Sequence, residues 1–115
     1  ARNNIKRIQN LEDVAATLEQ LWLSYNQIER LDNLAPLQKL TTFYISNNKI
    51  KSWEEVAKCS QLADLRTVLF FNNPVYTGTT KQENWPMVIK KIPQVETIDG
   101  SLVTATLRAE AEALE

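Results

Sequence analysis

The chain has 115 residues, of which 43% are hydrophobic and 23% charged, and its formal net charge is −1. This composition fits one soluble globular domain and provides no general positive field for nucleic acid or an anionic membrane. Without histidine, and with only two glycines, the chain offers no His-dependent catalysis, no His metal ligand and no Gly-rich phosphate loop. We therefore expect no enzyme activity and no cofactor. The single cysteine, Cys59, indicates a small buried thiol and a reducing compartment.

A repeated phrase of the form L-x-x-L-x-L-x-x-N-x-I organises the chain. It occurs at Leu18–Ile28 and Leu40–Ile50, with aliphatic variation at Leu65–Val75, and shortened at Asn3-Asn4-Ile5. Its asparagines are 23, 22 and 25 residues apart, at Asn3, Asn26, Asn48 and Asn73. This period predicts an α/β fold, a right-handed leucine-rich-repeat solenoid. Because the chain opens inside a repeat and without Met, we expect an N-terminally truncated array over residues 1–75 and a C-terminal cap over residues 76–115.

Each repeat is predicted to supply one short strand of a parallel sheet, at Leu21-Trp22-Leu23, Phe43-Tyr44-Ile45 and Val68-Leu69-Phe70. Alternation along a strand sends the flanking residues into the core and the central residue outward, onto a concave face. The outward positions form three columns: Gln20, Thr42 and Thr67; Trp22, Tyr44 and Leu69; and Ser24, Ser46 and Phe71. The marker asparagines are predicted to form a buried ladder, because an amide side chain can satisfy the backbone groups left unpaired where the chain turns away.

After each asparagine the apolar residues recur every third position, which predicts a convex wall of 3₁₀ turns. The three series are Ile5, Ile8, Leu11, Val14 and Leu18; Ile28, Leu31, Leu34, Leu37 and Leu40; and Ile50, Trp53, Val56, Cys59, Leu62 and Leu65. The last of these is longer, and Ser52–Gln61 is predicted to wind into an α-helix. We interpret Trp53 as a core residue.

The last 40 or so residues depart from the repeat and are predicted to form the helical cap that shields the end of a solenoid. Lys81–Ile92 reads as a helix with one apolar face, made of Trp85, Val88, Ile89 and Ile92. Val95–Ile98 is predicted to add a last strand-like rung, and Asp99-Gly100 a turn. Ser101 is the predicted N-cap of a final helix.

Large apolar side chains on the open face of a sheet indicate a binding surface. Together, Trp22, Tyr44, Leu69 and Phe71 would expose about 400 Å², the size at which apolar patches mark interaction sites. Burying that area would contribute about 10 kcal/mol before the costs of association. Gln20, Thr42, Ser46 and Thr67 would form a polar rim, and the ligand shape that fits best is a helix laid along the groove. The competing interpretation is a structural domain whose concave face is covered by its own missing segment.

Several segments resemble the axonemal dynein light chain 1 family, the leucine-rich-repeat light chains of outer dynein arms. They are Ala1–Ile5, Leu18–Leu31 with its Leu-Trp-x-Ser-Tyr-Asn run, Tyr44–Trp53, and the cap pairs Asn73-Pro74, Asn84-Trp85, Ile92-Pro93 and Ile98-Asp99-Gly100. The resemblance implies a non-catalytic motor subunit of the axoneme of cilia and flagella, a cytoplasmic and cytoskeletal location, and no nucleic acid or membrane partner.

The same resemblance implies a partner and its contacts. In that family the light chain binds the microtubule-binding domain of a dynein heavy chain and influences how the motor engages the microtubule, with tubulin as a further candidate contact. The family's apolar sheet contact maps onto Trp22, Tyr44 and Leu69, and its regulatory arginine onto Arg108. The positions near Arg108 are often acidic in the family, whereas here they are Thr104, Thr106 and Leu107.

A second interpretation is another intracellular leucine-rich-repeat adaptor, such as a phosphatase-regulatory or spliceosomal subunit. A phosphatase partner would favour an acidic, aromatic-rich concave face, and the columns here are neutral and apolar.

Overall fold

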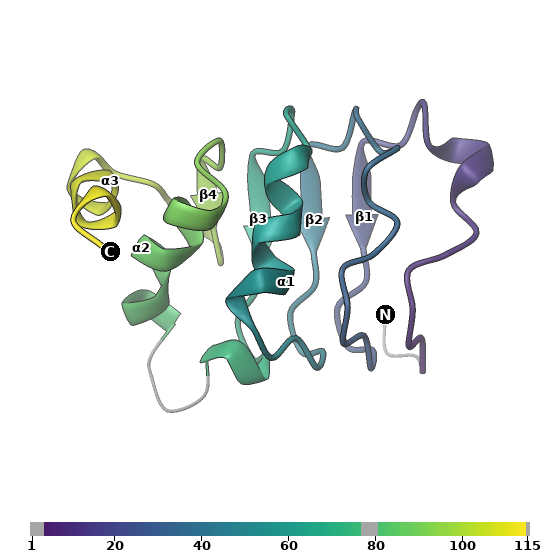
Figure 1. The fold of residues 1–115 in the computed structure, drawn as a ribbon, viewed down its shortest axis with the longest axis horizontal. Coiled ribbons are helices and arrows are strands. Elements are labelled where there is room, and N and C mark those ends of the chain that lie inside the picture. The colour runs from purple at the N-terminus through teal and green to yellow at the C-terminus, as the bar shows by residue number, and fades with distance from the viewer. Residues whose placement is uncertain (1–3, 77–80, 115) are drawn as a thin grey trace.

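In the computed structural model, which describes residues 4–76 and 81–114, the repeats stack into a coil 40 Å long (Figure 1). Strands β1 (Gln20–Trp22), β2 (Thr42–Tyr44) and β3 (Thr67–Leu69) pair in parallel. Strand β4 (Thr97–Ile98) continues the parallel sheet, and β5 (Ser101–Leu102) closes it in the antiparallel direction. The leucine-rich-repeat fold is confirmed, with the unpredicted β5 as the exception to a wholly parallel sheet.

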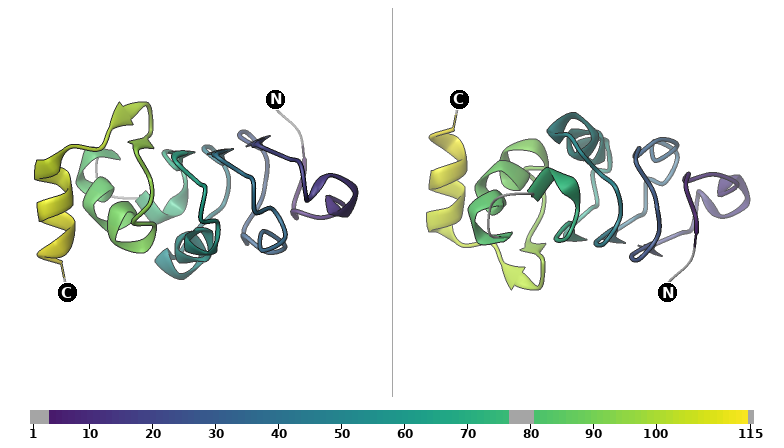
Figure 2. Two further views of the ribbon diagram at one scale, coloured as in Figure 1. Left: turned by 90° about the horizontal axis from the view of Figure 1, so that it is seen from above. Right: turned by 90° about the horizontal axis from the view of Figure 1, so that it is seen from below.

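The returning segments cover one face of this sheet and leave the other open. Figure 2 shows the strands along one side of the coil and the returns along the other. The returns carry η1 (Glu12–Val14), a run of turns after β1, and then α1 (Trp53–Ala57) continuing into η2 (Lys58–Gln61). Ser52 begins α1 as its N-cap, accepting a hydrogen bond from the amide of Glu55. The α-helix predicted over Ser52–Gln61 is thus confirmed for Trp53–Ala57, whereas Lys58–Gln61 keeps the 3₁₀ form.

The period of three places the second return in the core. Ile28, Leu31, Leu34, Leu37 and Leu40 are all buried, and i to i−3 backbone bonds join Leu37 to Leu34 and Leu40 to Leu37. The first return differs from the prediction, because Ile5 and Val14 are 38% and 40% exposed. These two residues belong to the first described rung, which has a described neighbouring rung on one side only.

The asparagine ladder is present at the three described positions, Asn26, Asn48 and Asn73, and all three are buried. The side chain of Asn48 is representative. Its Oδ1 accepts from the amide of Ile28 at 3.0 Å, and its Nδ2 donates to the carbonyls of Leu23 and Ile45 at 2.9 and 3.0 Å. Each side chain thus satisfies backbone groups of its own rung and a neighbour, as predicted. Asn3 lies outside the described residues.

The cap consists of η3 (Pro74–Tyr76), α2 (Lys81–Lys91) and α3 (Ala105–Glu112), which lie at the end of the coil in Figure 1. The predicted apolar face of α2 is buried: Trp85, Val88, Ile89 and Ile92. The predicted start of the last helix is wrong, because Ser101 belongs to β5 and Thr104 is the N-cap. The Thr104 hydroxyl accepts from the amide of Leu107 at 3.1 Å.

A buried aspartate ends the ladder. Asp99 follows β4, is 6% exposed and has a positive φ of 51°. Its Oδ1 accepts from the amides of Phe70 and Phe71 at 2.7 and 3.1 Å, and its Oδ2 accepts from the Tyr76 hydroxyl and Trp85 Nε1, both at 2.9 Å. One carboxylate therefore joins the last rung of the solenoid to η3 and α2 of the cap. The predicted turn at Asp99-Gly100 is present, but its structural role was not foreseen.

Candidate docking surface

A row of large apolar side chains crosses the open face of the sheet, and we call it the apolar row: Trp22, Tyr44 and Leu69. The three residues are in register on β1, β2 and β3. The rings of Trp22 and Tyr44 stack, with centroids 5.4 Å apart and planes 23° apart. Trp22 is 62% exposed, whereas Leu21, Phe43 and Val68 beside the row point into the core. The predicted alternation is therefore present, and the row faces outward.

A second row extends further along the same face. Strand pairing puts Gln20, Thr42, Thr67, Thr97 and Leu102 side by side. Gln20 is exposed, and Thr42 and Thr67 are half-buried, so these predicted rim residues reach the surface. Leu102 is 74% exposed, the largest exposed fraction among the large apolar side chains of the described chain. Sequence reasoning missed Leu102, because without the antiparallel β5 nothing assigns it to this sheet.

The third column differs from the prediction, which made Ser46 a rim residue and Phe71 a member of the exposed apolar patch. Ser46 is 3% exposed, and its hydroxyl bonds to that of Ser24 at 2.8 Å. Phe71 is half-buried and packs against the core. Both residues lie two positions beyond the end of their strands, where the chain already turns inward and strict alternation no longer applies. Ser46 is consequently a structural residue, and Phe71 presents only part of its ring.

Arg108 is separate from the apolar row. It lies on α3, and its guanidinium donates to the carbonyls of Pro93 and Val95 at 3.0 and 2.8 Å. These bonds fasten α3 to the segment that follows α2. The structure therefore gives Arg108 a structural contact and does not bring it together with Trp22, Tyr44 and Leu69.

Two other kinds of feature that the described residues could contain are metal sites and membrane-spanning helices. No cluster of three potential metal ligands occurs within residues 4–76 and 81–114. Over the same residues, no helix has the length and apolar character required to cross a membrane. Cys59 is buried, as predicted, and burial raises the pKa of its thiol far above the usual range. What the open face offers is shape, apolar area and uncharged polar groups.

Comparison with known proteins finds leucine-rich repeats in the chain and similarity to dynein light chains. Residues 17–58 match the family model described as Leucine Rich repeats (2 copies). Dynein axonemal light chain 1 of Chlamydomonas reinhardtii is 40% identical over 96% of this chain and 58% of its own length. Its Homo sapiens counterpart is 40% identical over 89% of this chain and 54% of its own length. The chain thus spans a little over half the length of these relatives.

A solved structure supports the fold alone. The crystal structure of the Drosophila melanogaster SNF/U2A′ complex contains a chain that matches 96% of this chain and 76% of its own length. The TM-score is 0.69 and the sequence identity is 20%. At that identity the match supports the solenoid architecture and carries no information about the partner.

Proposed function

We propose that the chain, which is 40% identical to dynein axonemal light chain 1 over most of its length, serves as a light chain of an outer-arm dynein. Its relatives are light-chain and leucine-rich-repeat proteins, so the proposed role is that of a non-catalytic subunit. The proposed location is the axoneme of a cilium or flagellum, where such a light chain would be held by a dynein heavy chain.

The open sheet face is the proposed heavy-chain contact, through Trp22, Tyr44 and Leu69 with Gln20, Thr42 and Thr67 at their side. One observation supports this most strongly: on the edge strand β1, Trp22 is 62% exposed and stacks on Tyr44 of β2, on the face of the sheet that the returning segments leave open. Tryptophan and tyrosine are the side chains that most often dominate the free energy of protein interfaces. Trp22 is largely exposed to water and Tyr44 is half-buried, and a bound partner would bury the apolar area that both still expose.

The heavy-chain region that we propose as the ligand is the microtubule-binding domain. A light chain held there would lie near the microtubule and modulate how the motor engages it, without taking part in ATP hydrolysis. The rows are uncharged and run across the strands for several rungs, each about 5 Å from the next. Such a surface suits the apolar side of a helix better than a charged segment.

A pull-down from a ciliary extract tests the proposal. The wild-type chain is expected to capture a dynein heavy chain as its main prey, identified by mass spectrometry. The Trp22→Ala/Tyr44→Ala variant should lose that prey. The matched control is Val14→Ala, since Val14 is also exposed but lies in η1 on the returning side. Capture of a phosphatase catalytic subunit instead, or equal capture by the double variant, would contradict the proposal.

A further inference from the structure

The first two repeats form a groove on the returning side of the coil, away from the apolar row. We call it the cationic groove. Its volume is about 880 Å³, and its walls come from two successive repeats: Lys6, Arg7, Ile8 and Gln9, then Glu29, Arg30, Asp32 and Asn33. Nothing in the proposed heavy-chain contact uses these residues.

The repeat stacks like charges in this groove. Arg7 and Arg30 both stand four residues after a marker asparagine, so they occupy equivalent positions on adjacent rungs. One position earlier, Glu29 and Lys51 are equivalent, and their side chains form an ion pair across the rungs at 3.7 Å. Side chains at this part of the turn therefore meet from rung to rung. Arg7 and Arg30 thus line the same groove from adjacent rungs, where a bound anion would reduce the repulsion between their positive charges.

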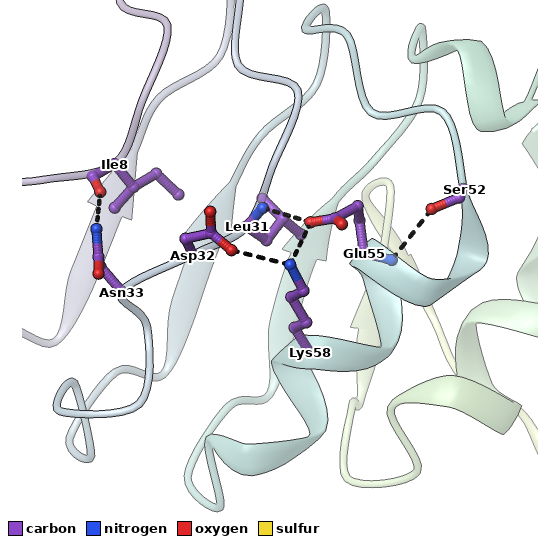
Figure 3. A network of polar contacts seen from close by, with 7 residues as sticks. All are labelled: Ile8, Leu31, Asp32, Asn33, Ser52, Glu55 and Lys58. Carbon is purple, nitrogen blue, oxygen red and sulfur yellow. Dashed lines mark hydrogen bonds and ion pairs between the residues drawn. The ribbon is translucent and has the colours of Figure 1, made fainter.

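The floor of the groove is held in place by polar contacts (Figure 3). Asn33 Nδ2 donates to the carbonyl of Ile8 at 2.7 Å, which ties the two walls together. Glu55 Oε1 accepts from the amide of Leu31 at 2.8 Å, so the wall is also anchored to α1. These contacts fix the backbone that carries Arg7 and Arg30, so the two rungs do not have to move relative to each other when a ligand binds.

Three cations and two carboxylates line the groove, and the two carboxylates pair with lysines outside it, one of which, Lys58, also pairs with Glu55. Asp32 pairs with Lys58 at 2.9 Å, and that hydrogen bond, aided by Arg30 and Arg7, lowers the pKa of the Asp32 carboxyl. Glu29 pairs with Lys51. By contrast, Lys6, Arg7 and Arg30 are exposed and form no ion pair with any residue in the described part of the chain.

We propose that the cationic groove binds an acidic peptide segment. Arg7 and Arg30 would each bind one carboxylate, and Lys6 would add a third positive charge. A guanidinium matches a carboxylate in bidentate geometry, which gives direction as well as attraction. The carboxylates of Glu29 and Asp32 in the walls disfavour a continuous polyphosphate backbone, and none of the lining residues is aromatic, so bases have nothing to stack on. A peptide also supplies backbone N–H donors for those two wall carboxylates.

Fluorescence anisotropy with a labelled hexaglutamate peptide tests this proposal. Arg7→Ala/Arg30→Ala should bind at least tenfold more weakly than wild type, and wild-type binding should weaken with added salt. The control Lys39→Ala/Lys49→Ala removes the same charge from exposed residues outside the groove, and it should bind within about twofold of wild type. Circular dichroism melts of both variants check that each one is folded.

Two further results would overturn the proposal: an equal loss in both double variants, or tighter groove-dependent binding of an oligonucleotide of the same charge. The test is independent of the dynein assignment, because Trp22→Ala/Tyr44→Ala should bind hexaglutamate like wild type. A negative result with hexaglutamate would not bear on the proposed heavy-chain contact, and a negative result in the heavy-chain pull-down would not bear on peptide binding in the groove.

Discussion

Replacing Asp99 by asparagine should detach the cap from the solenoid at a measurable energetic cost. The carboxylate accepts four hydrogen bonds, two through each oxygen, from donors on the last rung and the cap. Asparagine has one oxygen and one NH₂ group. In one orientation the NH₂ faces the two backbone amides, and in the other it faces the indole N–H of Trp85; all of these groups can only donate a hydrogen bond. At least one buried donor is left unpaired, and the remaining bonds lose their charged acceptor. Charged hydrogen bonds contribute about 1.5–3 kcal/mol each, so we expect a loss of about 2–4 kcal/mol.

The measurement is urea unfolding followed by far-ultraviolet circular dichroism. A domain of this size has a total stability of about 5–15 kcal/mol, so the expected loss is a large fraction and should lower the midpoint clearly. Asp64→Asn is the matched control, since Asp64 is exposed and the substitution changes the charge identically. If the free energies of unfolding of the two variants differ by less than about 0.5 kcal/mol, the Asp99 carboxylate does not stabilise the junction of cap and solenoid as we argue.

Three other predictions concern stability and reactivity. Asn48→Ala should lower the free energy of unfolding in urea by at least about 3 kcal/mol, because a buried amide and several buried carbonyls lose their hydrogen-bond partner. An unchanged urea midpoint would contradict the stabilising role that we assign to the asparagine ladder. Cys59 should react with a thiol reagent at pH 8 only as fast as the chain unfolds, since burial raises its pKa; rapid labelling of the native protein would contradict this. Hydrogen bonds to Glu55 and Asp32 raise the pKa of Lys58, so its stabilising contribution is full at neutral pH and is lost as the pH rises through that raised pKa. Lys58→Met should therefore be slightly less stable than wild type near pH 8 but not at strongly alkaline pH, and a pH-independent difference would contradict the ion pairing.

Much of the fold could be predicted from the sequence, because it follows from local patterns with a physical cause. Alternation over a three-residue strand is enough to turn Phe43 inward and Tyr44 outward. The period of three in the return from Ile28 to Leu40 fixes which side packs on the core. The amide of Asn48 has the donors and acceptor that a turn of the chain requires.

The failures come from places where the local pattern ends. Ser46 was assigned to the surface by continuing the alternation past the strand, although β2 stops at Tyr44 and the chain turns inward there. Ser101 looks like an N-cap in isolation, but its backbone is used by β5, so the helix starts at Thr104. For Ser46 the strand ends too early for the alternation to hold, and for Ser101 pairing with β4 overrides the local capping signal.

The remaining features depend on residues that are distant in sequence. The carboxylate of Asp99 is understood only when Tyr76 and Trp85 are seen to converge on it. Arg108 likewise reaches carbonyls that lie 13 and 15 residues earlier in the chain. Spacing alone gives no signal for such contacts, and the exposed Leu102 was missed because its place on the sheet depends on its pairing with Thr97.

The most direct test of the proposed light-chain role is the affinity of the purified chain for the purified microtubule-binding domain of an outer-arm dynein heavy chain, measured by isothermal titration calorimetry. Truncating an interface hot spot costs about 2 kcal/mol or more, which is about a 30-fold change in Kd. We predict at least that loss for Trp22→Ala/Tyr44→Ala and unchanged affinity for Val14→Ala. Wild-type affinity in the double variant, with its fold intact, would contradict the assignment of the open sheet face as the docking surface.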